Sequence, residues 1–411
     1  MIWGRGGAPY PLERASFPAI RYVLTAFAAL LAGPFALAQG EGACIEMAAA
    51  SALVADLTEA GYEAVGVCLA GDVALVTYEN GVLRYDVRAI QDVTRRAADH
   101  LGARRLRLVP TSNGIPLLEQ EVYSAGPEVG TASLDVPADL PATSNSPRGK
   151  LDVVVHPEVR ANFGDFDRPV RLDVSLAPTL EVGVARGLSL TGQVVLPLLT
   201  QTGETSGQIR PGIVALHQET RLPLNTFVRA SVGRFTRDRY GVDLVASTFV
   251  QDGRGALTLR AGRTGFARLD SRTWTYSAVN TTTYAITADY LVLPAYGFGA
   301  SATHARYLSG ESGWRVDLHR SFGEASVAVF GLVAGGEPNL GGRITLPLPI
   351  RRHPAPRRVR VRLADRFDVE YRYRRTVAGT PDYAVTPTLW DPLGPVNPAL
   401  LPYHLQRHRA P

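Results

Sequence analysis

The longest regular pattern in the chain is an alternation of apolar and polar residues between positions 151 and 349. In Val170–Ala185 the even positions are apolar and the odd positions are charged or small. Successive side chains of a strand point to opposite faces, so this pattern predicts strands with one apolar face. Such stretches recur at intervals of about fifteen residues. They are Leu151–Arg160, Val170–Ala185, Leu188–Leu198, Ile209–Gln218, Phe227–Phe235, Tyr240–Gln251, Leu257–Arg263, Tyr284–Val292, Tyr296–His304, Trp314–Phe322, Ala325–Val333 and Arg343–Leu348.

The length of these stretches indicates which kind of β-protein they form. Strands of soluble β-sandwiches average about five to six residues, whereas a strand that crosses a bilayer needs about nine to eleven. In lipid only a closed barrel leaves no unpaired edge. We therefore predict a mainly β fold, with a transmembrane antiparallel β-barrel of about twelve strands over residues 150–349. Aromatic residues near the strand ends are typical of interface girdles: Tyr240, Trp274, Tyr276, Tyr284, Tyr290, Tyr296, Tyr307, Trp314 and Phe322.

In this register the charged residues face the barrel lumen. The predicted lumen-lining residues are Arg171, Asp173, Glu181, Arg229, Asp243, Arg260, Asp289, Arg315, Asp317 and His319. A lumen of mixed charge fits a channel for a hydrated, acidic chain. It fits equally a plugged barrel with internal salt bridges, and the sequence does not separate the two.

The N-terminus predicts export. Arg14 and Arg21 precede the apolar stretch Tyr22–Ala32, and Ala36-Leu-Ala38 follows as a small-residue cleavage site. These are the three parts of a secretory signal peptide, which we assign to residues 1–38.

Residues 39–123 predict a small α+β domain in the periplasm. Two helical stripes, over 47–57 and 89–101, accompany short strand-like runs, and Ser112-Asn113-Gly114 is a strong hairpin turn. Cys44 and Cys68 are the chain's two cysteines, and in an oxidising compartment they predict a disulfide worth about 3 kcal/mol. Two free buried thiols are the alternative. Residues 124–149 show no periodicity and predict a linker.

The C-terminal segment, residues 350–411, is rich in arginine between 351 and 375 and keeps an alternation that allows a further strand or hairpin. For an exported protein, contact with anionic lipid or acidic polysaccharide suits such a run better than nucleic acid. The net charge of +5 over 411 residues is also too small to indicate nucleic-acid binding.

Candidate chemistry is sparse. No metal-ligand spacing and no glycine-rich phosphate loop occur in the sequence, so we predict no metal, cofactor-binding or catalytic residue. Asp165 and Asp167 resemble a paired-carboxylate site, but they stand in a turn sequence where Asp is expected. His156 reads as a solvated lumen group. A barrel hydrolase would use His217 or His304 with a serine, yet no serine pattern singles out a nucleophile. We expect a protein that is not an enzyme.

Several segments resemble the YjbH-type outer-membrane proteins of exopolysaccharide and capsule export. They are Tyr78–Tyr85, Asn113–Pro116, Ala305–Gly323 and Gly342–Pro349, with Ala305 and Glu311 in place of the family's Gly and Asp. The resemblance implies an outer-membrane barrel with its N-terminal domain in the periplasm of a Gram-negative bacterium. It also implies a role in polysaccharide biosynthesis and secretion, with the polysaccharide chain, membrane lipid and periplasmic or lipoprotein components of the same export system as partners.

Three other functions stay open at this stage. A general porin or small-solute channel is the leading alternative. A membrane-embedded lipid or sugar hydrolase and a soluble periplasmic binding protein are the others.

Overall fold

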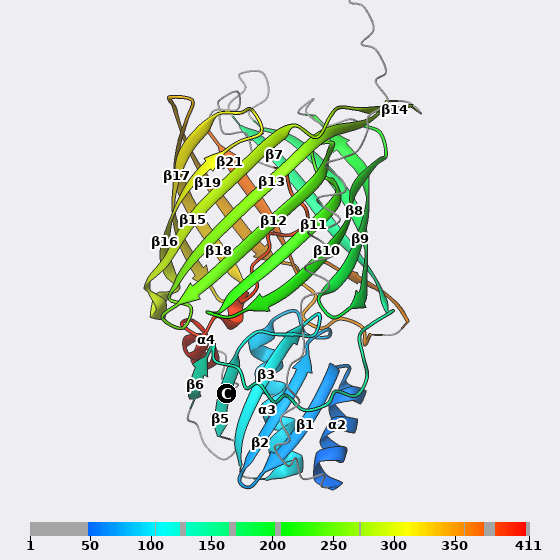
Figure 1. The fold of residues 1–411 in the computed structure, drawn as a ribbon, viewed down its shortest axis with the longest axis vertical. Coiled ribbons are helices and arrows are strands. Elements are labelled where there is room, and N and C mark those ends of the chain that lie inside the picture. Colours follow the sequence, from blue (N-terminus) through cyan, green and yellow to red (C-terminus); the bar gives the residue numbers. More distant parts are fainter. Residues whose placement is uncertain are drawn as a thin grey trace, which may run out of the picture.

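The computed structural model describes residues 48–102, 104–123, 129–163, 170–201, 207–270, 273–356, 358–373 and 383–407. Figure 1 shows a large, curled sheet with a smaller α+β domain beneath one of its ends. The predicted signal peptide and Cys44 lie outside the described residues. In the described part, no helix is long and apolar enough to cross a membrane.

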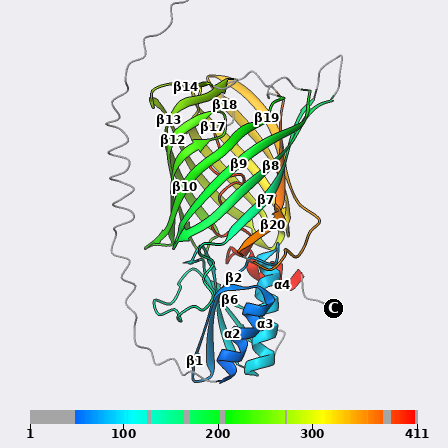
Figure 2. The ribbon, with the colours of Figure 1, turned by 90° about the vertical axis from the view of Figure 1, so that its right-hand side faces the viewer.

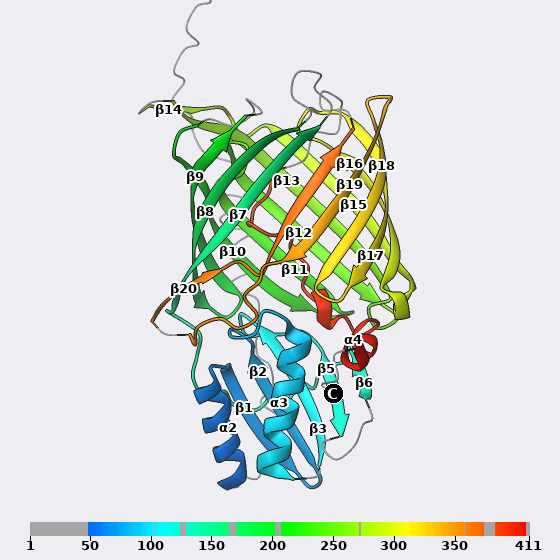
Figure 3. The ribbon, with the colours of Figure 1, turned by 180° about the vertical axis from the view of Figure 1, so that it is seen from behind.

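The smaller domain is a sheet with two helices packed on one face (Figures 2 and 3). Its sheet runs in the order β1-β2-β3-β5-β6, with β4 beside β3, and β2 and β3 are parallel. The helical stripes that the sequence shows pack inward, where Leu53, Leu57 and Ile90 are buried. Its elements are α2 (Ala48–Ala60), β1 (Glu63–Ala70), β2 (Val73–Glu79), α3 (Asp86–Leu101), β3 (Arg105–Ser112), β4 (Ile115–Pro116), β5 (Glu119–Tyr123) and β6 (Val129–Ser133).

The region expected to be a linker, 124–149, differs from that expectation. Val129–Ser133 forms β6 and pairs with β5, and Leu134 after it is buried. Asn145 then turns back onto the domain: its amide donates to the carbonyl of Tyr62 at 2.6 Å and its Oδ1 accepts from the amide of Val65 at 3.2 Å. A five-residue strand flanked by Gly and Pro is too short to leave a periodic signal, so only pairing reveals it.

Cys68 lies in β1 and is disulfide-bonded. Its predicted partner, Cys44, is among the residues that the structure does not describe.

The large sheet, which we call the wall, holds fifteen strand segments in the described chain, in the order β20-β7-β8-β9-β10-β11-β12-β13-β15-β16-β17-β18-β19-β21, with β14 beside β13. This confirms a mainly β chain. The segments are β7 (Leu151–Phe163), β8 (Val170–Ala185), β9 (Leu188–Thr200), β10 (Arg210–Leu222), β11 (Thr226–Phe235), β12 (Arg239–Val250), β13 (Gly255–Asp270), β14 (Thr273–Tyr276), β15 (Thr281–Leu293), β16 (Phe298–Arg306), β17 (Ser312–Phe322), β18 (Ala325–Ala334), β19 (Glu337–Pro347), β20 (Val359–Leu363) and β21 (Arg366–Arg372).

The count exceeds the expected twelve because β14, β20 and β21 add to the predicted strands. The two ends of the strand order, β20 and β21, are consecutive in the chain. β20 pairs with the start of β7 in parallel, and β21 pairs antiparallel with β19. One kinked stretch, 359–372, thus bridges the first and last long strands, and the amide of Ala364 donates to the carbonyl of Val155 at 3.0 Å. No ladder joins β21 directly to β7 within the described residues.

The alternation of the sequence becomes an inside and an outside of the wall. In β18, Val329 is 61% exposed while its neighbour Ala328 is 6% exposed; in β17, Leu318 is 47% exposed and Asp317 is 6% exposed. The apolar set therefore covers the outer surface, and the polar set faces the enclosed interior. This is the reverse of a water-soluble sheet, whose apolar face is the buried one.

Large aromatic residues gather near both ends of the outer surface. Tyr290 of β15, Phe322 of β17 and Tyr296, in the connection between β15 and β16, are exposed near the turns closest to the smaller domain. At the far end, Trp274 stacks on Tyr276 with ring centroids 6.0 Å apart. Trp314 is also exposed there, and its ring centroid is 4.9 Å from that of His304.

The smaller domain and the wall share one hydrophobic core. Phe227 and Phe249 of the wall are buried in the same cluster as α2, α3 and the domain's strands. α4 (Leu401–Arg407), at the C-terminal end, contributes Leu401 and Leu405 to this cluster. Figure 3 shows α4 wedged between the two parts. Because burying apolar surface stabilises by about 25 cal/mol per Å², a shared core fixes the domain against the wall.

The predicted hairpin turn at 112–114 is present, and a carboxylate binds its tip. Asn113 and Gly114 have φ angles of 50° and 73°, as a type I′ turn requires. Their backbone amides donate to the Glu79 carboxylate at 3.0 and 3.1 Å. Burial raises the pKa of Glu79 to about 7, although these two hydrogen bonds act to lower it.

The pKa of Glu79 predicts how the domain responds to pH. The folded chain holds this proton more tightly than an unfolded chain, in which a glutamic acid titrates near 4.3. Its contribution to stability is therefore complete below about pH 4 and is lost as the pH rises through 7, at about 1.4 kcal/mol per unit of pKa difference. Glu79→Gln should flatten the fall in stability between pH 5 and pH 8.

The measurement is hydrogen exchange of residues 105–123 in the whole protein, corrected for the intrinsic exchange rate. Burial also raises the pKa of Asp86, to about 6, so part of the slope should persist in the variant. An unchanged slope in Glu79→Gln contradicts the assignment.

Candidate functional site

The interior of the wall is occupied by the protein's own C-terminal region. Residues 383–400, which we call the inner segment, pass along the concave side of the sheet before α4 begins (Figure 1). At one end the amide of Ala384 donates to Thr236 Oγ1 at 2.7 Å, in the turn before β12. At the other end Asn397 donates to the carbonyl of Gly253 at 2.9 Å, in the turn after β12. The inner segment thus spans the full length of β12.

Side chains rather than a β-ladder hold the inner segment, since no described ladder includes it. Its deepest anchor is Tyr383, whose ring stacks on Phe235 with centroids 5.3 Å apart and planes 11° apart. The Tyr383 hydroxyl donates to Asp243 Oδ2 at 2.8 Å. Arg260 donates to the same oxygen and to the Tyr383 carbonyl, both at 2.9 Å, and lies 4.7 Å from the ring centroid.

A glycine makes room for this tyrosine. A Cβ at Gly262 of β13 would lie 1.6 Å from the Tyr383 hydroxyl oxygen. No larger residue fits there while Tyr383 is in place. Thr283, the cross-strand neighbour of Gly262, closes the pocket with its hydroxyl 3.5 Å from that oxygen.

Arg229 of β11 forms the second anchor. It donates to Thr386 Oγ1 at 3.3 Å and lies 5.0 Å from the centroid of the Trp390 ring, a cation–π contact. A charged group buried in a protein must be paired or hydrogen-bonded. The inner segment therefore supplies partners for charges that the wall turns inward.

Several buried polar atoms of this interior have no hydrogen-bond partner among the described residues. They include Asp243 Oδ1, Arg229 Nε and His217 Nε2. Buried polar groups are almost always satisfied by protein or by water, so the interior has spare hydrogen-bonding capacity next to the inner segment.

The predicted lumen-lining residues are all buried or partly buried on the inner face, and many are paired with one another or with neighbouring polar groups. Arg260 binds Asp243, His319 lies 3.0 Å from Asp289, and Arg315 binds Asp317 at 2.7 Å. The amide of Gln201 donates to Asp173 at 2.8 Å, and Glu181 is 3.7 Å from Arg362. Arg229 is paired as above, and Arg171 is partly buried at the start of β8.

The residues considered for catalysis do not form a triad. His217 Nδ1 is 2.8 Å from Ser231 Oγ, its direct cross-strand neighbour, and both residues are 2% exposed. No described carboxylate binds the other nitrogen of His217. His304 lies between the aromatic rings of Tyr284 and Trp314 on the outer surface.

Of the other candidates, His156 is buried in β7, and Asp165 and Asp167 lie outside the described residues. The described chain holds no group of three or more His, Cys, Asp or Glu side chains that could bind a metal ion.

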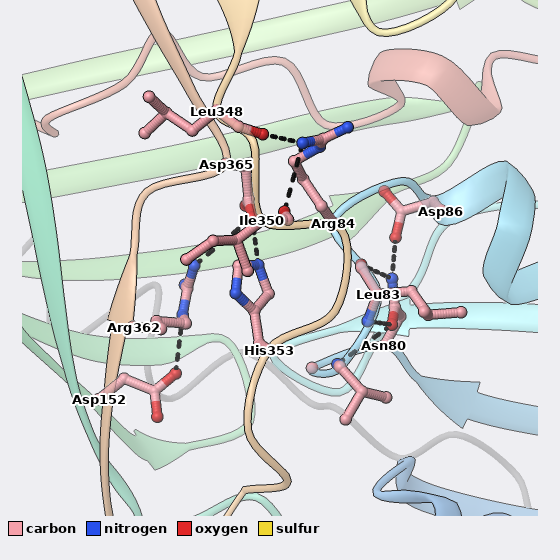
Figure 4. A network of polar contacts seen from close by, with 12 residues as sticks. Asn80, Leu83, Arg84, Asp86, Asp152, Leu348, Ile350, His353, Arg362 and Asp365 are labelled. Carbon is pink, nitrogen blue, oxygen red and sulfur yellow. Dashed lines mark hydrogen bonds and ion pairs between the residues drawn. The ribbon is translucent and has the colours of Figure 1, made fainter.

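A second polar network joins the smaller domain to the wall (Figure 4). The loop 80–86, which follows β2 and ends on the first residue of α3, forms backbone hydrogen bonds with the chain that follows β19. The amide of His353 donates to the carbonyl of Val82 at 2.7 Å, and that of Arg84 donates to the carbonyl of Arg351 at 3.2 Å. Asn80 shapes the loop by donating to Leu83 and Asp86, as Figure 4 shows.

Arg84 carries this loop onto the wall. Its buried guanidinium pairs with Glu324, in the turn between β17 and β18. It also donates to the carbonyls of Leu348 and Ile350, as Figure 4 shows. Removing one partner of a buried ion pair is costly because the other charge stays buried. Arg84 therefore fixes the domain to a defined place on the wall.

The same network reaches the junction of β20 with β7. Arg360 binds Asp152 and the carbonyl of Gly81, so one side chain contacts both strands and the loop 80–86. Arg362 lies 3.4 Å from Asp152 and 3.6 Å from Asp365. His353 lies 2.7 Å from Asp365. Part of the arginine-rich run, predicted to contact lipid or acidic polysaccharide, is thus paired within the protein.

Sequence reasoning missed the inner segment and this junction. Residues 383–400 contain Trp390 and Leu393, but they show no periodicity that distinguishes a segment inside the wall from a surface loop. The arginines of 351–375 were visible in the sequence, but their partner Asp152 lies two hundred residues earlier.

Comparison with known proteins gives little. No protein-family model and no curated protein sequence matches the chain. Among solved structures, a loop L8 deletion mutant of OmpT, an outer membrane protein of Vibrio cholerae, is 10% identical over 47% of this chain and 84% of that chain, with a TM-score of 0.27. OmpT folded in vitro is 11% identical over 47% of this chain and 78% of that chain, with a TM-score of 0.22. Likenesses this weak carry no argument about function.

One expectation is corrected at this point. The prediction that the chain is not an enzyme finds no support in these comparisons. The structures found are both of OmpT, and they give no ground for excluding an activity. The exclusion of catalysis is withdrawn.

Proposed function

We propose that this protein is an outer-membrane β-barrel that takes part in the biosynthesis and secretion of an exopolysaccharide. The outer-membrane part of this proposal is supported by the distribution of residues on the wall. Its outer surface is apolar, with aromatic residues near both ends, and its interior is charged. Water does not favour such a surface, whereas the hydrocarbon of a bilayer does. The stretch 359–372 would complete the barrel between β19 and β7, leaving no long strand edge in lipid.

The polysaccharide half of the proposal rests on the resemblance to YjbH-type proteins. Two of the segments that carry it, Tyr78–Tyr85 and Asn113–Pro116, are among the parts of the smaller domain that contact the wall. Besides the contacts of the loop 80–86, the amide of Gly187 donates to the carbonyl of Asn113 at 2.8 Å, and Arg221 donates to that of Pro116 at 3.0 Å. The residues that resemble the family thus hold the smaller domain, for which we propose a periplasmic location, against the barrel.

Placing the outer surface in lipid predicts the effect of a charge there. Val329→Arg, in the middle of β18, should destabilise the protein by about 2 to 4 kcal/mol in lipid vesicles. The control is Ala55→Arg on the exposed face of α2, expected to change stability by less than about 0.5 kcal/mol. The measurement is urea unfolding of both variants in vesicles. Equal effects of the two substitutions speak against a lipid-facing wall.

The export role has its own test in the bacterium. Deleting the gene should lower the secreted polysaccharide while the cell-associated, newly synthesised polymer persists, because synthesis precedes passage through the outer membrane. The two pools are measured by sugar analysis of medium and cells, and complementation with the wild-type gene is the control. Unchanged secretion sinks this proposal.

A porin is the alternative that the interior argues against. The inner segment spans the length of β12, and α4 and the smaller domain lie at one mouth of the wall. We expect little conductance from the wild-type protein in planar bilayers, and a clear increase after deletion of residues 383–411. A large, stable conductance of the wild-type protein favours the porin instead.

A further inference from the structure

We propose that the pocket occupied by Tyr383 is a binding site for a pyranose ring of the polysaccharide, and that Tyr383 fills it while no polymer is present. The proposal rests on the function proposed above and names the ligand class and its place in the barrel. The pocket is formed by Phe235, Asp243, Arg260, Gly262 and Thr283.

The walls of the pocket have the chemistry of a sugar site. A pyranose presents a flat face of C–H groups, which stacks on an aromatic ring, and a rim of hydroxyls that donate and accept hydrogen bonds. Phe235 offers the aromatic face, now covered by the parallel Tyr383 ring. Asp243 and Arg260 form a charged, hydrogen-bonded pair at the rim, where they now bind the hydroxyl and the carbonyl of Tyr383. Binding sites commonly combine an apolar surface with a few placed polar groups.

The pocket offers more hydrogen bonds than Tyr383 uses. Asp243 is 3% exposed, and its Oδ1 has no partner among the described residues. Tyr383 brings one hydroxyl, whereas a pyranose ring carries several. An occupant with two neighbouring hydroxyls can bind both oxygens of Asp243, so a sugar satisfies the site better than the tyrosine does.

The occupant can be displaced because no ladder fixes it. The inner segment is held at separate points, chiefly by Tyr383, by Thr386 and Trp390 on Arg229, and by Asn397. Two of the three atoms nearest to a Cβ placed at Gly262 belong to Tyr383 and the third is Thr283 Oγ1, so the departure of the tyrosine frees space beside this glycine. Releasing Tyr383 therefore exposes a ready-made cavity next to Arg229.

The test is isothermal titration of the purified full-length protein in detergent micelles. The probes are maltohexaose, a neutral oligosaccharide, and a hexamer of mannuronate, an acidic one, so the two arms separate a neutral from an acidic pyranose. Tyr383→Ala should bind one of them at least about tenfold more tightly than the wild-type protein, because the pocket is vacated. Adding Asp243→Asn should reverse most of that gain by removing the carboxylate that accepts the sugar hydroxyls.

The matched control is Asn397→Ala, which loosens the inner segment at its other end but leaves Tyr383 in the pocket, and it should bind as the wild-type protein does. Tyr383→Phe keeps the ring, loses the hydrogen bond to Asp243, and should give an intermediate gain even if Tyr383→Ala folds poorly. Circular dichroism and heat-shifted gel mobility check the fold of each variant. The proposal is overturned if neither Tyr383 variant binds either probe more tightly, or if Asp243→Asn has no effect.

Failure of this site and failure of the export role give different results. If deletion of the gene lowers secretion but Tyr383→Ala binds neither probe, the sugar site is wrong and the export role stands. If Tyr383→Ala binds a probe and secretion is unchanged by the deletion, the site stands and the export role is wrong.

Discussion

The constraint on which the rest of this structure depends is that the wall turns its charged residues inward. Strict alternation places Arg229, Asp243, Arg260 and Asp317 on the concave face, away from bulk water. Charges in such a place need partners. Some are paired across the inner face of the sheet, such as Asp289 of β15 and His319 of β17, whose strands are separated by β16. Others also find partners on the inner segment, which passes through the interior and contacts Arg229 and Arg260.

The inner segment ties the parts of the molecule together. It leaves the interior at Gly253 and continues into α4, whose Leu401 and Leu405 join the core shared by the smaller domain and the wall. The segment inside the wall is therefore continuous with the helix that packs against the smaller domain.

The docking network restricts how the smaller domain can move. Arg84, in the loop 80–86, donates to the carbonyl of Leu348 after β19, and Arg360 of β20 donates to the carbonyl of Gly81 in that loop. The backbone amide of His353 donates to the carbonyl of Val82. Because the interface combines a shared hydrophobic core with a buried ion pair, it restricts the movement of the smaller domain relative to the wall.

The sequence by itself determined the local features of this protein. Apolar residues at every second position determined the strands and their faces, and apolar residues at every third or fourth position determined α2 and α3. The pair Asn113-Gly114 determined the hairpin turn. Each depends on neighbours within a few residues, so each leaves a readable pattern. Only the tertiary structure decided that the inner segment lies inside the wall, that β6 lies within the expected linker, and that Asp152 pairs with Arg360. Those depend on contacts between residues far apart in the chain. The physical reason is that Tyr383 needs a pocket that exists only once β11, β12, β13 and β15 stand side by side.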